Sequence, residues 1–283
     1  MINNIFKGNY INLNHKMESD KSDFLLEIKT VQVSAFRTLI EALKEILTDA
    51  NFEFENTGMK LIAMDTSHTV LVHLKLLSEK FEYYYCPKRV VIGINMLNYF
   101  KLIKTMSNSD TLTLYVTKDN PNSLGIKIEN NEKNQVTIYE LNLMDLHLET
   151  IEIPPAAFDS VITLPSVEFQ KITREMHNLS DKIEIKSAGS QLIFSCKGDF
   201  ATRTTIMGET PGGMSYLENQ NPDEIIQGIF TLKNLVLFSK CTNLSNSIEM
   251  YLKNDYPLII MYTVASLGQI KLCLAPDLTE ATE

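Results

Sequence analysis

Short runs of β-branched and aromatic residues, separated by polar turns, dominate the hydrophobic pattern from Phe24 onward. Such runs, bounded by turn signals like the KDNPNS stretch at 118–123, are typical of strands. The pattern therefore predicts a strand-rich chain. The expected strands cover residues 24–31, 61–65, 69–76, 83–86, 111–116, 124–128, 135–141, 183–187, 191–197, 248–252 and 258–264.

Four segments instead place apolar residues at helical spacing. Each is followed by a short polar turn and then by a strand, so the same helix–turn–strand unit occurs four times. The predicted buried stripes are Phe36, Ile40, Leu43 and Leu47 in residues 33–47; Met96, Phe100 and Ile103 in 95–106; Phe169, Ile172 and Met176 in 166–179; and Leu232, Val236 and Ser239 in 231–241.

The four units form two similar pairs. Phe36 and Phe169 are 133 positions apart, and Met96 and Leu232 are 136 apart. These similar separations indicate a duplicated domain with two units in each copy. The stretch between the copies ends in two prolines, which is typical of an extended connector. The expected segments are a flexible extension (1–23), a first domain (24–140), a connector (141–159), a second domain (160–279) and a tail (280–283).

Composition narrows the class of protein. Hydrophobic residues make up 44% of the 283 positions, which is ample for a sizeable core. The four cysteines, Cys86, Cys196, Cys241 and Cys273, have no metal-ligand spacing, so we expect buried, reduced thiols in an intracellular protein and no metal site. No apolar run approaches the ~20 residues of a membrane span, and no signal-peptide pattern opens the chain.

The net charge of −9 means that any contact with nucleic acid requires a local concentration of positive charge. At about 100° per residue, the basic side chains of the four predicted helices fall on a similar flank beside each apolar stripe. Only Lys171 lies outside this arc. Those inside it are Arg37 and Lys233 at about 100° from their anchors, Lys101 and Arg174 at about 140°, and Lys44, Lys104 and Lys240 at about 80°.

This flank has two interpretations. Solvated lysines beside a core stripe are common on single helices. Repetition over four helices instead indicates one shared, negatively charged partner, for which a phosphate backbone is the obvious candidate. Neither a zinc-finger spacing nor an aromatic ribonucleoprotein motif is present, so we expect binding without sequence specificity.

Asp65, Ser67 and His68 lie within four residues and raise the possibility of a hydrolase triad. Adjacent residues of a strand point to opposite faces, so Ser67 and His68 would not meet one substrate. The chain also lacks the Gly-x-Ser-x-Gly nucleophile elbow. A polar loop between two core strands is the better interpretation.

Six blocks of the sequence, in order and at close to the family's spacing, resemble the proliferating cell nuclear antigen family of DNA sliding clamps. The blocks are residues 39–54, 58–76, 90–104, 141–154, 164–176 and 255–278.

The resemblance implies an α+β fold with two similar clamp domains per chain, in which sheets form the outside of a ring and helices line its hole. It implies a homotrimer that encircles duplex DNA without sequence specificity, confers processivity on DNA polymerase and docks a clamp loader and other proteins through short peptides. No catalytic activity, cofactor or membrane contact is implied. The expected location is the nucleus, or a viral replication compartment if the chain is virus-encoded.

The resemblance also implies roles for individual residues. Ring closure would join edge segments near 134–141 and 201–207. The implied DNA-facing residues are Arg37, Lys44, Lys101, Lys104, Lys171, Arg174, Lys233 and Lys240. The implied pocket for partner peptides contains Met64, His68, Thr69, Leu71, Ile151, Ile153, Pro154, Pro257, Ala275 and Pro276.

The chain departs from the family pattern at several positions. Cys273 stands where a Tyr is frequent and makes a smaller wall for the pocket. Asp277 replaces a common Lys, and Gly189 occupies the place of a frequently modified lysine, although Lys186 is near. Alternative functions are a subunit of a heterotrimeric checkpoint-type clamp, or a protein-interaction scaffold without DNA binding.

Overall fold

The computed structural model describes residues 23–147, 151, 153 and 156–277. Helices and strands follow each other in the same order in the two halves of this chain, which confirms the α+β fold with two similar domains. Pro154, predicted to line the peptide pocket, and the extension before Asp23 lie outside the described residues.

The first half contains all elements up to the connector. They are β1 (Phe24–Thr30), α2 (Val33–Ile46), β2 (Asp49–Glu55), β3 (Gly58–Met64), β4 (Val70–Leu77), η2 (Ser78–Lys80), β5 (Tyr83–Tyr85), β6 (Val90–Asn95), α3 (Met96–Ile103), β7 (Thr111–Thr117), β8 (Ser123–Asn130) and β9 (Gln135–Asn142).

The second half repeats this order from β10 onward, with a 3₁₀ segment, η3, after its second helix. Its elements are β10 (Ser160–Pro165), α4 (Ser166–His177), β11 (Lys182–Ala188), β12 (Gln191–Lys197), β13 (Thr202–Gly208), β14 (Ser215–Asn219), β15 (Ile226–Thr231), α5 (Leu232–Phe238), η3 (Ser239–Leu244), β16 (Ser247–Leu252), β17 (Leu258–Val264) and β18 (Gly268–Leu274).

The strands of the described chain form three antiparallel sheets. Their orders are β5-β1-β7-β8-β9, β14-β10-β16-β17-β18-β4-β3-β2-β6 and β13-β12-β11-β15. The nine-stranded sheet contains strands of both halves, because β18 pairs with β4 from Gly268↔Leu76 to Leu274↔Val70. We call this pairing the internal junction.

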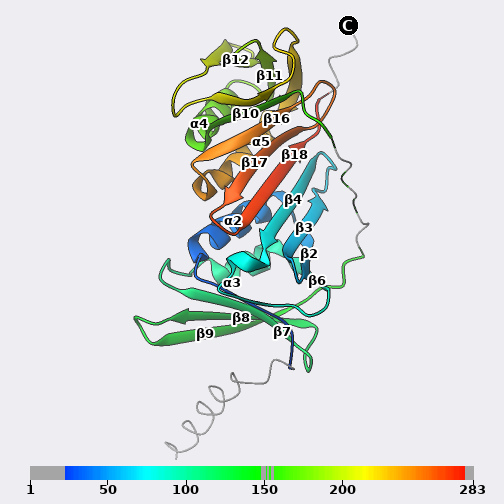
Figure 1. The fold of residues 1–283 in the computed structure, drawn as a ribbon, viewed down its shortest axis with the longest axis vertical. Helices are drawn as coiled ribbons and strands as arrows, with labels where there is room; N and C mark the ends of the chain where they lie inside the picture. Colours follow the sequence, from blue (N-terminus) through cyan, green and yellow to red (C-terminus); the bar gives the residue numbers. More distant parts are fainter. Residues whose placement is uncertain (1–22, 148–150, 152, 154–155, 278–283) are drawn as a thin grey trace, which may run out of the picture.

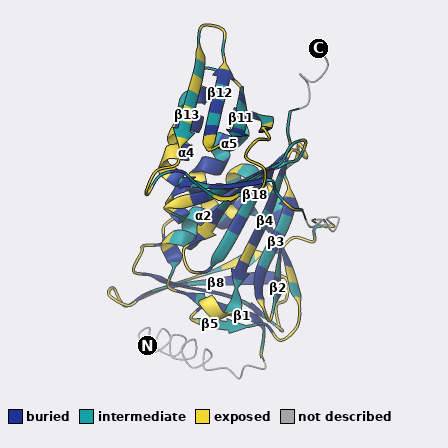
Figure 2. Cartoon of the chain, turned by 45° about the horizontal axis from the view of Figure 1, so that its top comes forward, coloured by how far each residue is buried: buried dark blue, intermediate teal, exposed yellow. Residues whose placement is uncertain are grey.

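The helices lie together on one side of the nine-stranded sheet (Figure 1). Alternation along the strands shows which side chains face them: Val72, Ile260 and Leu272 are completely buried. Their neighbours in the chain point to the opposite face, because successive residues of a strand alternate. We call the helix-covered side the inner side and the opposite side the outer side. Burial in Figure 2 follows this division, with a continuous core between helices and sheet.

The helices form where the apolar stripes predict them, with two corrections. Phe36, Ile40 and Leu43 of α2 are completely buried, whereas Phe100 and Val236 are only half-buried. The fourth helix changes to a 3₁₀ segment after Phe238, and a 3₁₀ turn has three residues instead of 3.6. Within α5 itself, Leu235 and Phe238 are the buried side chains beside the half-buried Val236, as Tyr99 is beside Phe100 in α3. No helix of the described residues is long and apolar enough to cross a membrane.

Candidate functional site

The exposed surface of the helices and η3, which we call the inner face, carries all eight predicted DNA-facing residues. Six of them are exposed, and in the described chain no ion pair joins five of these six to a carboxylate. Lys101 only approaches the neutral amide oxygen of Asn98, at 3.4 Å. The five are Lys101, Lys104, Lys171, Arg174 and Lys233.

The other three cations are engaged with the protein itself. Arg37 donates to the carbonyl of Met106 and, at 3.3 Å, to Asn108 in the turn after α3. Lys44 pairs with Glu45 and lies 4.8 Å from the ring centroid of Phe100, so its side chain is only 14% exposed. Lys44 is therefore not an ordinary solvated lysine, because it contacts Phe100 of α3.

Glu45 also reaches across the two halves of the chain. Its Oε1 lies 3.5 Å from the Nζ of Lys240 in η3. The hydrogen bond from Lys44 lowers the pKa of the Glu45 carboxyl; burial opposes this shift and Lys240 supports it. Lys44, Glu45 and Lys240 form one cluster, which we call the ionic clip.

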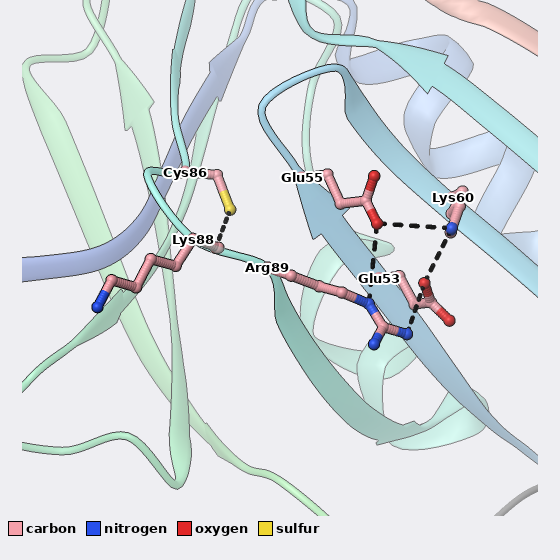
Figure 3. Close-up of polar contacts among 6 residues, drawn as sticks. All are labelled: Glu53, Glu55, Lys60, Cys86, Lys88 and Arg89. Atoms are coloured by element: carbon pink, nitrogen blue, oxygen red, sulfur yellow. Dashed lines mark hydrogen bonds and ion pairs between the residues drawn. The ribbon is translucent and has the colours of Figure 1, made fainter.

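Several cations outside the helices are paired with carboxylates on the strands. Lys60 and Arg89 share two carboxylates on β2, with Glu53 at 3.1 and 3.0 Å and Glu55 at 3.6 and 3.8 Å (Figure 3). Lys127 pairs with Glu129 at 2.7 Å. Five cations that lack a carboxylate partner among the described residues therefore lie on the inner face.

The Asp65 loop has the geometry of a tight turn and lacks the geometry of a triad. The two oxygens of Asp65 accept bonds from the backbone of Ser67, Thr69 and Val70 and from the Ser67 hydroxyl. The Ser67 hydroxyl also lies 2.7 Å from that of Thr69. His68 is exposed, with φ of 56°, and among the described contacts its imidazole does not join this network. The described contacts place no imidazole beside the Ser67 hydroxyl, so Asp65, Ser67 and His68 are not arranged as a Ser-His-Asp triad.

An apolar row crosses the outer side of the nine-stranded sheet beside this loop. Strand register aligns Met64 with Leu71, Leu71 with Cys273, Cys273 with Ile259 and Ile259 with Tyr251. We call these five side chains the outer row. Burial raises the pKa of the Cys273 thiol to about 11, so it behaves as a small apolar wall.

The two ends of the connector meet this side of the sheet. Met144 bridges to Gly93, and Leu146 accepts a bond of 3.1 Å from Asn51, which fixes the start of the connector on β2 and β6. At the other end, the ring of Phe158 packs edge-on against Tyr251 at 5.4 Å and Tyr256 at 5.8 Å.

The structure brings together only part of the predicted pocket. Met64 and Leu71 share the outer row, and the backbone of Ala275 donates to Thr69 at 3.0 Å. Ile151 is half-buried and Ile153 is exposed. Pro257 lies directly after Tyr256 in the chain, and Pro276 follows Ala275 in the tail.

The tail after β18 is attached to both halves of the chain. Ala275 is bonded to the Asp65 loop, while the Asp277 backbone donates to Ile229 of β15 at 2.8 Å. The Asp277 carboxylate also pairs with Lys182 at 3.1 Å. The departure at Asp277 therefore supplies a local ion pair that holds the tail beside the outer row.

Sequence reasoning missed Ile259, Tyr251 and Phe158. The alternation in residues 258–264 could have identified Ile259, because Leu258, Ile260 and Tyr262 face inward. No pattern in the sequence brings Phe158 to Tyr251, since that contact depends on the path of the connector.

The Asp65 carboxylate predicts a pH-dependent stability. Burial alone would raise its pKa, but the bonds from Ser67, Val70 and Thr69 outweigh burial and hold the pKa below its ordinary value. Its contribution is present above the pKa of the unfolded chain and is lost as pH falls through the folded value. We expect Asp65→Asn to cost about 1 kcal/mol at pH 7. The difference in free energy of unfolding between Asp65→Asn and wild type should shrink between about pH 5 and pH 2.

Urea unfolding at a series of pH values would measure this gap. Asp119→Asn, in an exposed turn, is the matched control and should leave the profile unchanged. A gap for Asp65→Asn that stays constant down to pH 2 would contradict the role of the ionised carboxylate.

Comparison with known proteins gives the family. Residues 25–151 match the model of the proliferating cell nuclear antigen N-terminal domain, and residues 152–277 match that of its C-terminal domain. The chain is 36% identical over 264 residues to a "Probable DNA polymerase sliding clamp 1" of Paramecium bursaria Chlorella virus 1, covering 92% of this chain and 100% of that protein. It is 31% identical over 259 residues to the "Proliferating cell nuclear antigen" of Chaetomium thermophilum, covering 90% and 98%. The chain therefore belongs to the proliferating cell nuclear antigen family.

Proposed function

We propose that this chain is a DNA sliding clamp: a homotrimeric ring that encircles duplex DNA, holds a DNA polymerase on its template and docks other proteins on its outer side. The observation that carries the proposal is the set of unpaired cations on the inner face of a protein with a net charge of −9. Its location would be a nucleus or a viral replication compartment, and its role would be non-catalytic.

Lysine and arginine at these positions fit a phosphate backbone. These lysines and arginines do not form a known base-reading motif. Contacts of such side chains with phosphates carry no sequence information. Such contacts give binding that weakens steeply with salt while allowing a protein to move along the duplex. Both properties suit a ring that slides.

Ring closure is supported by the internal duplication. The internal junction pairs β4 of the first half with β18 of the second. The counterpart of β4 in the second half is β13, and the counterpart of β18 in the first half is β9. These two strands are free edges of their sheets in a single chain. Pairing β9 of one subunit with β13 of the next would repeat the internal junction between subunits, and head-to-tail contacts of this kind close into rings.

The internal junction also predicts the register between subunits. The β3–β4 and β12–β13 hairpins superpose Leu77 on Gly208, and the β8–β9 and β17–β18 hairpins superpose Leu141 on Leu274. Transferring the β4–β18 register onto β13 and β9 places Val136 opposite Ile206. Their side chains are 53% and 59% exposed in the single chain. Contact between these two apolar side chains across the strands would favour pairing of the edges.

We therefore expect Val136→Cys combined with Ile206→Cys to form covalent trimers under mild oxidation, because directly opposite residues of antiparallel strands are close enough for a disulfide. The four native cysteines are buried and should not compete. Denaturing electrophoresis without reductant measures the product. The control is Val136→Cys with Thr204→Cys, which lies two residues out of register and should cross-link poorly. Equal yields from both pairs would contradict this register.

Reversing the charge of Lys104 and Lys233 to Glu should weaken binding to a 30-bp duplex and flatten its salt dependence. For every phosphate that the protein no longer neutralises, the slope of log K against log salt decreases in magnitude by roughly 0.9. Fluorescence anisotropy between 20 and 150 mM salt would measure this. Lys75→Glu with Lys88→Glu changes the net charge equally, at exposed lysines outside the helices. If that control weakens binding as much, net charge rather than the inner face governs the contact.

The outer row and the nearby connector would receive partner peptides, because a few apolar anchors supply most of the affinity of short-motif binding. We expect Ile153→Glu to weaken a peptide taken from the polymerase of the same replication system by tenfold or more. Isothermal titration would measure the affinity, and Val91→Glu, at another exposed apolar position, is the control. Unchanged affinity in Ile153→Glu would remove the connector from the site.

The mass of the purified chain in solution distinguishes a homotrimer from a subunit of a heterotrimeric clamp. The proposal requires three copies at micromolar concentration by light scattering. A monomer would favour a mixed ring, in which the free edges pair with other chains.

A further inference from the structure

The two halves of this chain meet at the inner face through the ionic clip. Lys240 of η3 lies 3.5 Å from Glu45 of α2, and Lys44 pairs with the same carboxylate. One acidic residue of the first half thus joins two cations, one from each half. The clip lies on the helix side of the same two halves that β4 and β18 join in the sheet.

The duplication identifies the residues that occupy the same places between subunits. The backbone of Met96 donates to Thr48, and that of Leu232 donates to Asp181 in the same way. These bonds fix the offset at 133 residues between α2 and α4 and at 136 between α3 and α5. Strands β7 and β16 keep the second offset, since they begin at Thr111 and Ser247.

With these offsets, the counterparts of the ionic clip follow directly. Lys44 corresponds to His177, Glu45 to Asn178, and Lys240 to Lys104. In a ring closed by β9 and β13, Lys104 of one subunit would face His177 and Asn178 of the next. The cation of the clip is retained there, but its carboxylate is replaced by a neutral amide.

In the described part of the single chain, the polar groups of His177, Asn178 and Lys104 lack the partners that the members of the ionic clip have. Within the described residues, Nδ1 of His177 is buried and has no hydrogen-bond partner, which is costly for a polar atom. Asn178 is exposed at the C-terminal end of α4, and Lys104 is exposed after α3 without an ion pair. Among the described residues of their own subunit, these three groups have no partners of opposite charge, unlike the members of the ionic clip.

We infer that Asn178 keeps the seam between subunits weaker than the internal junction, so that the ring opens at the seam while the two domains of each subunit stay joined. The inference rests on the proposed ring, and it assigns Asn178 and Lys104 as the pair that sets how readily the seam opens. Sheet pairing closes both junctions alike, and the missing carboxylate makes the difference between them.

Asn178→Glu should restore the missing pair with Lys104 of the next subunit. A partly exposed ion pair slows the separation of one seam by about 1.5- to 5-fold, and release of a subunit breaks two seams, so subunit exchange should slow by about 2- to 25-fold. Mixing rings labelled with donor and acceptor fluorophores would follow exchange by energy transfer. Asn178→Gln, which is neutral and equally long, should exchange at the wild-type rate.

A second variant guards against an unfavourable carboxylate at the end of α4, where the helix dipole prefers cations. Asn178→Lys with Lys104→Glu forms the same pair with reversed signs and should also slow exchange. Asn178→Glu with Lys104→Gln should exchange subunits as fast as wild type, because the pair is lost. The inference is overturned if neither charged pair slows exchange, or if the slowing persists without Lys104. A wild-type chain that forms no ring at all would show in its mass and would overturn the proposed function as well.

Discussion

The antiparallel pairing of β18 with β4 is the constraint on which the rest of this structure depends. It merges strands of both halves into one nine-stranded sheet and holds all helices on one side of it. Because side chains alternate along each strand, the same pairing aligns Leu71 with Cys273 on the outer side. The inner face and the outer row are thus on two sides of one sheet.

Duplication turns this internal pairing into a means of assembly. Among the edge strands of the described chain are β9 and β13, the counterparts of the β18 and β4 that pair in the internal junction. In the proposed ring, repeating the junction between copies would place Val136 opposite Ile206. The repeat would not be perfect there, because Glu45 has Asn178 as its counterpart, and this difference would leave the seam between subunits weaker than the internal junction.

The cations of the inner face fall into two groups, those that are exposed to solvent and those that contact other groups of the protein. Lys44 and Arg37 stand at the same helical angles as exposed cations, yet they contact Phe100 and the Met106 carbonyl. Helical spacing gives the angle at which a side chain leaves its own helix. It does not show whether another helix packs against that side chain. Helical spacing likewise assigned Val236 to the core, but Val236 is half-buried, and Leu235 and Phe238 are the buried side chains.

The sequence by itself determined the alternation of strands, the four helices, the duplication and the family, because these depend on local periodicity and on order along the chain. It also placed the cations on one flank of each helix. Only the tertiary structure decided which cations remain free, that Asp65 ties a turn, and that Phe158 meets Tyr251. These depend on contacts between segments far apart in the chain, and distance in space between such segments is not encoded in any local pattern.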